Sequence, residues 1–147
     1  MKRLPRYLLA VLACALALPA LAGECKPVLK NGWISLPPIP APTVLAGYGT
    51  LANPCAKAAI VVGAESPVFE RTMLHASTVV DGVSRMRSLG ELPIAAKGSV
   101  TFAPGGQHLM LLQPSAPLRE GDRVAVAFKL KDGGEIIGEL AVRKAMP

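Results

Sequence analysis

The stretch RTMLHASTVVDGVSRMRS, residues 71–88, decides the fold, because two runs suited to β-strands flank an Asp-Gly pair. Asp81-Gly82 is a strong signal for a tight β-hairpin turn. The run on each side of this turn is short and offers no sustained helical period. The stretch therefore predicts two antiparallel strands that lie side by side.

The same kind of pattern recurs along the rest of the chain. Short β-branched or apolar segments alternate with Gly, Pro, Asn and Asp, and no window sustains a helical period for three turns. LPPIPAP, residues 36–42, predicts an extended loop, and KDGG, residues 131–134, predicts a second hairpin turn. The number and spacing of segments predict an all-β fold, a Greek-key sandwich or barrel. The predicted strands are Lys30–Leu36, Ala46–Leu51, Ala58–Gly63, Val68–Val79, Val83–Leu89, Ser99–Ala103, His108–Gln113, Arg123–Leu130 and Glu135–Val142.

Residues 1–22 have the pattern of a cleavable secretory signal peptide. Three basic residues precede an apolar run from Tyr7 to Leu18, and Ala20-Leu21-Ala22 supplies a small-residue cleavage site. The apolar run is shorter than the roughly 20 residues that a membrane-spanning helix needs. We therefore expect a single domain over residues 23–147, periplasmic or secreted, with no stable membrane insertion after cleavage.

The charge of the chain argues against nucleic acid as a partner. The 147 residues hold 16 Lys and Arg against 10 Asp and Glu, and residues 1–22 contain three of the basic residues and no acidic one. Without that segment the balance is 13 against 10, a net charge of +3. The remaining basic residues are scattered, with few aromatic side chains for base stacking. We expect a monomer with a solvated, weakly basic surface.

Two cysteines lie after the predicted cleavage site, Cys25 and Cys55. An even pair in an oxidising compartment predicts a disulfide. The bridge closes a loop of about 30 residues, for which the chain-entropy account gives roughly 3.5 kcal/mol of stability. A dithiol redox or metal site is the alternative, although CxxC spacing is absent. Lipid attachment is disfavoured, because Cys14 comes too early in the apolar run and Glu24 directly precedes Cys25.

A histidine and a methionine stand two residues apart in GGQHLMLL, residues 105–112. Side chains alternate along a strand, so His108 and Met110 share one face. The only other histidine, His75, lies in the first hairpin. It is diagonal to Met86 if the turn is Asp81-Gly82, and directly opposite Met86 if the loop has four residues. Both registers put His75 and Met86 on the same face.

Imidazole and thioether donors together have a definite chemical meaning. Imidazole suits copper and zinc alike, whereas neutral thioether sulfur favours Cu(I) over harder ions. Zinc prefers thiolate, imidazole or carboxylate ligands. Each residue also has an ordinary interpretation, since a methionine in a strand usually fills the core and a lone histidine is usually a satisfied polar group. Met73, two residues before His75 on the same face, is either a substitute ligand or a core residue.

The order of these four residues resembles the signature of a known family. His75, ten residues, Met86, twenty-one residues, His108, one residue and Met110 match the H-x10-M-x21-H-x-M signature of periplasmic PCu(A)C-type copper chaperones. Further segments that resemble this family are AGYGTLAN at 46–53, VVGAESPVFERTMLHAS at 61–77, DGVSRMR at 81–87, FAPGGQHLMLL at 102–112 and PLREGDRVAVAFKLKDGG at 117–134.

The resemblance implies a cupredoxin-like β-sandwich that carries Cu(I). It implies that His75, Met86, His108 and Met110 are the metal ligands. It also implies delivery of copper to the CuA centre of cytochrome c oxidase subunit II or to another copper-handling protein.

Other functions remain open from the sequence. They are copper buffering or resistance, blue-copper electron transfer, which needs a thiolate with two imidazoles, and a secreted binding module without metal. No nucleophile–base pattern or phosphate-binding loop is present in the sequence, so we expect no enzymatic activity.

Overall fold

The computed structural model describes residues 24–145, and the predicted signal peptide, residues 1–22, lies outside that range. Every regular element in the described range is a β-strand. None of the described residues forms a helix long and apolar enough to cross a membrane. The strands are β1 (Val28–Leu36), β2 (Val44–Ala52), β3 (Ala59–Glu65), β4 (Phe69–Val80), β5 (Val83–Ser88), β6 (Leu92–Ile94), β7 (Ser99–Phe102), β8 (Gln107–Pro114), β9 (Arg123–Leu130) and β10 (Glu135–Lys144).

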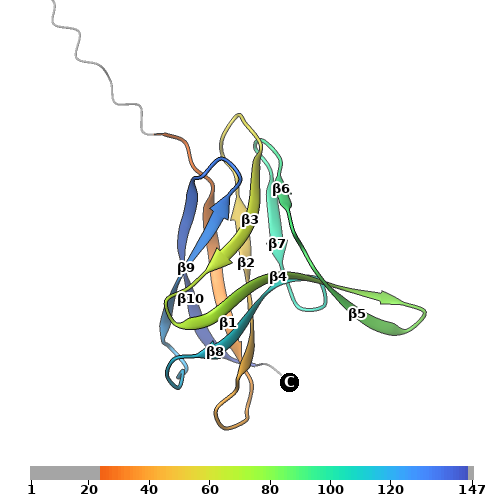
Figure 1. Cartoon of the computed structure of the whole chain (residues 1–147), viewed down its shortest axis with the longest axis vertical. Coiled ribbons are helices and arrows are strands. Elements are labelled where there is room, and N and C mark those ends of the chain that lie inside the picture. Colours follow the sequence, from red (N-terminus) through yellow and green to blue (C-terminus); the bar gives the residue numbers. More distant parts are fainter. Residues whose placement is uncertain (1–23, 146–147) are drawn as a thin grey trace, which may run out of the picture.

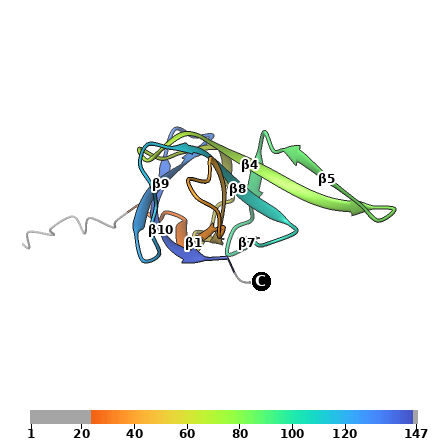
Figure 2. The same cartoon turned by 90° about the horizontal axis from the view of Figure 1, so that it is seen from below.

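The strands form one sheet that closes around a core, with the order β5-β4-β8-β2-β1-β10-β9-β3-β6, while β7 pairs with β2. Every pairing is antiparallel except that of β1 with β10. Figures 1 and 2 show the strands arranged around a common centre, and the β4–β5 hairpin projecting away from it as an arm. This architecture confirms the predicted all-β sandwich.

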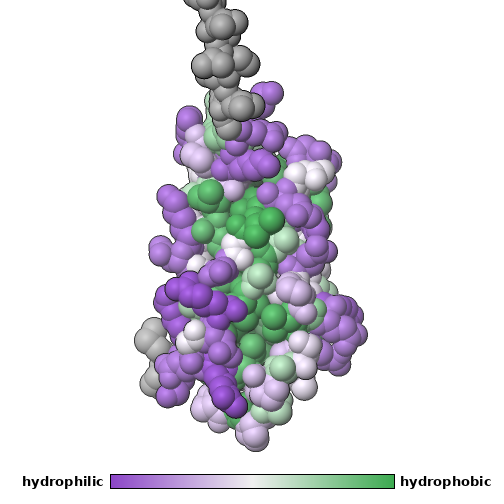
Figure 3. All heavy atoms as spheres, turned by 90° about the vertical axis from the view of Figure 1, so that its left-hand side faces the viewer, coloured by the Kyte–Doolittle hydropathy of each residue, from purple (hydrophilic) through white to green (hydrophobic). Residues whose placement is uncertain are grey.

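Alternation along the strands separates a dry core from the surface. In β9, Val124, Val126 and Phe128 are buried while the residues between them point outward. On the outer side of β9 and β10, Ile137 is 74% exposed. Apolar side chains form a band down the middle of the molecule on this side, with hydrophilic residues flanking it (Figure 3).

Nine of the ten strands lie within two residues of their predicted bounds. The sequence does not predict β6, which has only three residues with Pro93 in the middle. Proline has no N–H to donate to the hydrogen bonds between strands, so its presence predicts a break in a strand. β6 lies at the edge of the sheet, where it pairs with β3 alone, and an edge tolerates the missing donor.

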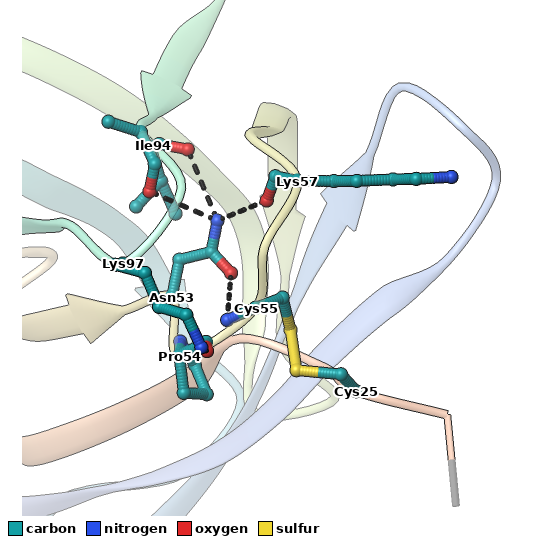
Figure 4. Close-up of a disulfide and its surroundings, with 8 residues drawn as sticks. Cys25, Asn53, Pro54, Cys55, Lys57, Ile94 and Lys97 are labelled. Carbon is teal, nitrogen blue, oxygen red and sulfur yellow. Dashed lines mark hydrogen bonds between the residues drawn. A yellow bond between two sulfur atoms is a disulfide. The ribbon is translucent and has the colours of Figure 1, made fainter. Parts of the chain in front are cut away.

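The predicted disulfide is present and closes one end of the sandwich. Cys25 and Cys55 are joined with their Cα atoms 5.7 Å apart. Beside them, Asn53 is almost fully buried, and its amide NH₂ donates to the carbonyls of Lys57, Ile94 and Ala95. Its amide oxygen accepts from the backbone N–H of Cys55 at 3.1 Å (Figure 4). The bridge therefore anchors the N-terminal residues to a loop that is itself held by buried hydrogen bonds.

We predict that the double substitution Cys25→Ser, Cys55→Ser lowers the free energy of unfolding by about 3.5 kcal/mol, because the unfolded chain regains the freedom of a closed loop. Urea unfolding of the oxidised protein and of the variant measures this difference. A loss below about 1 kcal/mol would contradict a stabilising role for the bridge.

Candidate metal centre

The pairing of β4 with β8 brings the two histidines together. In this antiparallel register His75 lies opposite His108, and Met73 lies opposite Met110. Leu74 and Leu109, which are buried in the core, alternate with these residues, so both imidazoles are on the face that points away from the core. The two rings are 6.0 Å apart between centroids and nearly perpendicular. Residues 33 positions apart in the chain thus become neighbours.

The hairpin turn sets the position of Met86. Asp81 and Gly82 both have positive φ, 52° and 76°, as a two-residue type I′ turn requires. The turn pairs His75 with Ser88 and Ser77 with Met86, so His75 is diagonal to Met86. This is the first of the two predicted registers. The His75 Nδ1 and Met86 Sδ atoms are 3.1 Å apart, within hydrogen-bonding distance.

His108 is held in one orientation by the backbone. It is 7% exposed, and its Nδ1–H donates to the carbonyl of Gly106 at 3.0 Å. The same carbonyl accepts from the backbone N–H of Ser77 at 3.0 Å, which ties the turn before β8 to β4. With Nδ1 carrying the proton, Nε2 of a neutral His108 keeps a free lone pair. A backbone partner on the other ring nitrogen is the usual arrangement of a metal-binding histidine.

His75 and Met86 lie in a more open environment. Burial lowers the pKa of His75 below its usual value, and the neighbouring His108 lowers it further because two imidazolium charges repel. Met86 is 56% exposed, and β5 is exposed along its whole length. The cluster is therefore enclosed on the β8 side and open on the side of the β4–β5 arm.

The donor set fits a soft metal ion. All four predicted ligands, His75, Met86, His108 and Met110, are on one face of the β5-β4-β8 part of the sheet. Within residues 24–145 no three His, Cys, Asp or Glu side chains are grouped to hold a metal. Both described cysteines are in the disulfide, which leaves neither as the thiolate that blue copper needs.

The sequence predicts the donors but not the strand pairing that joins them. It gave two local pairs, one in the β4–β5 hairpin and one on β8, and no rule of sequence spacing placed β8 beside β4. It also left Met73 undecided. The register puts Met73 opposite Met110, next to His75, on the face of the predicted ligands.

Comparison with known proteins gives a family and a fold. The sequence model of the LpqE-like family, described as "Putative lipoprotein LpqE-like", matches residues 28–142. A putative lipoprotein of Leifsonia xyli subsp. xyli, Lxx21020, is 34% identical over 89 residues, which are 60% of this chain and 54% of the relative. The match thus spans about half the length of that relative.

Solved structures of two other proteins share the fold. The copper-bound PCuAC domain from PmoF2 has a TM-score of 0.63 at 20% identity, over 80% of this chain and 92% of that domain. Apo-DR1885 from Deinococcus radiodurans has a TM-score of 0.64 at 26% identity, over 99% and 97% of the two chains. Its CuI form has a TM-score of 0.59 at 28% identity, over 89% and 83%. These matches confirm the resemblance to PCuAC-type proteins and the cupredoxin-like sandwich.

The lowered pKa of His75 predicts a specific pH dependence in the metal-free protein. The unfolded chain takes up this proton near pH 6.5 and the folded protein only at lower pH. The contribution of His75 to stability is therefore complete above pH 6.5 and is lost as the pH falls below it. NMR titration of the His75 ring measures the midpoint. A midpoint at or above 6.5 would contradict this environment.

Proposed function

Since the chain belongs to the LpqE-like family, we propose that it is a copper chaperone that binds Cu(I) outside the cytoplasm. The observation that carries the proposal is the β4–β8 register, which places His75 opposite His108 with methionines beside both. The PCuAC-type fold and the copper-bound forms of the similar proteins support it.

The proposed ligands are His75, Met86, His108 and Met110. The two imidazoles supply nitrogen, His108 through Nε2, and the thioethers supply sulfur that favours Cu(I). All four donors are neutral, so the bound ion keeps its single positive charge and no proton has to leave a neutral site. Protonation of either histidine competes with the metal, and the lowered pKa of His75 keeps this ligand available in mildly acidic solution.

The disulfide supports an extracytoplasmic location. Bridges such as Cys25–Cys55 persist in oxidising compartments. A thiolate copper site there tends to oxidise, whereas a thioether has no disulfide to form. The predicted signal peptide and the description of the relatives as putative lipoproteins agree with export.

The open side of the cluster suits a carrier. Met86 is the most exposed of the four proposed ligands, so an acceptor can approach the metal from the arm and displace protein ligands one at a time. Thioethers are modest ligands, and Cu(I) then moves downhill to a site that binds it more tightly. The acceptor we propose is the CuA centre of cytochrome c oxidase subunit II, with the chaperone acting as a monomer. Copper buffering or resistance is the alternative.

We predict that His108→Ala, Met110→Ala weakens Cu(I) binding by at least about 100-fold, more than the loss of an outer-shell partner costs. Anaerobic competition against a chromogenic Cu(I) chelator measures the affinity. Leu112→Ala is the matched control, because Leu112 is on the same face of β8 and carries no donor atom. Equal affinity of the wild type and the double variant would contradict the proposal.

Delivery and buffering make different predictions for cells that lack the protein. If the protein delivers copper to the oxidase, a deletion strain loses oxidase activity and regains it when copper is added to the medium. Oxidase activity in membranes measures both effects. A deletion strain with normal oxidase activity and increased sensitivity to copper would instead support buffering.

A further inference from the structure

The donors on β4 and β8 form an inverted pair of motifs. β4 carries Met73 and His75 in the order Met-x-His, and β8 carries His108 and Met110 in the order His-x-Met. Because the strands are antiparallel, His75 faces His108 and Met73 faces Met110. Met73 is two residues from His75 on the same strand and diagonal to His108. Met110 is likewise two residues from His108 and diagonal to His75, so the two methionines have equivalent positions relative to the imidazoles. Facing Cβ atoms are about 4.5–5.5 Å apart and diagonal ones about 7–8 Å.

We propose that Met73 is a further Cu(I) ligand, which replaces Met86 when β5 releases the metal. This inference rests on the proposed copper function. It adds a donor outside the four-residue signature, and it gives the centre three thioethers for two histidines.

The positions of the two methionines make them suited to exchange. Met86 is 56% exposed on a strand that is exposed throughout, so few contacts hold its side chain. Met73 is half-buried on β4, where β8 pairs with it directly. Met73 is therefore on the better-fixed strand, although the four-residue signature does not include it.

A groove next to Met73 gives its side chain room to move. The groove has a volume of about 720 Å³, and its walls include Met73, Phe69 on β4 and Ala125 on β9. Methionine has three rotatable bonds and adapts to irregular space. The thioether of Met73 can therefore occupy the groove while Met86 binds copper, and turn toward the histidines when Met86 leaves.

The exchange replaces one neutral sulfur with another. The bond from copper to Met86 Sδ breaks as the bond to Met73 Sδ forms, while His75, His108 and Met110 stay bound. No electron or proton moves, and the copper remains Cu(I). β5 is then free to contact an acceptor without loss of the metal to solvent.

Affinities of Met73→Leu, Met86→Leu and the double variant for Cu(I), measured by anaerobic chelator competition, test the exchange. We expect each single variant to lose little, because the other methionine substitutes for it. The double variant should lose about tenfold more than the product of the two single losses, as expected for residues that act on the same ligand position. Losses that simply multiply would overturn the proposal.

X-ray absorption of the Cu(I)-loaded Met86→Leu protein provides a readout that needs no change at Met73. We expect two sulfur ligands per copper, from Met110 and Met73, and a single sulfur would overturn the inference. Val79→Ala is the control for changes to the arm, since Val79 is exposed on the same face as Met86 and has no donor atom. If the wild type itself binds no Cu(I), the proposed function fails, and this inference fails with it.

Discussion

The antiparallel pairing of β4 with β8 holds both histidines, and the arrangement of the candidate site depends on it. The pairing is fixed from the core side, because Leu74 on β4 and Leu109 and Leu111 on β8 are buried. A slip of one residue would turn these leucines to the solvent and the histidines into the core. The hydrophobic core therefore determines which face carries the imidazoles.

The two ends of this arrangement differ in how firmly they are held. The disulfide and the buried amide of Asn53 fix the loops at one end of the sandwich. β5, in contrast, is exposed along its whole length and brings only Met86 to the cluster. A centre with nitrogen ligands on paired strands and one sulfur on an exposed arm suits a protein that has to bind copper and then give it up.

The sequence predicted most of the fold because its turn signals are local. Asp81-Gly82 alone was enough to place the first hairpin and to bring His75 and Met86 to one face, and the Cys25–Cys55 bridge followed from cysteine count and compartment. The pairing of β4 with β8 could not be read from spacing, because the two histidines are 33 residues apart and three strands intervene. β6 escaped prediction because Pro93 interrupts a strand of three residues, and the partner of Met73 became visible only with the register.

We propose that copper lies between the facing histidines of β4 and β8. A crystal structure of the Cu(I)-loaded protein, with anomalous scattering measured at the copper absorption edge, locates the ion directly. We predict one strong anomalous peak within bonding distance of His75, His108 and at least one methionine sulfur. A peak elsewhere on the molecule, or none between these two side chains in protein that contains copper, would contradict it.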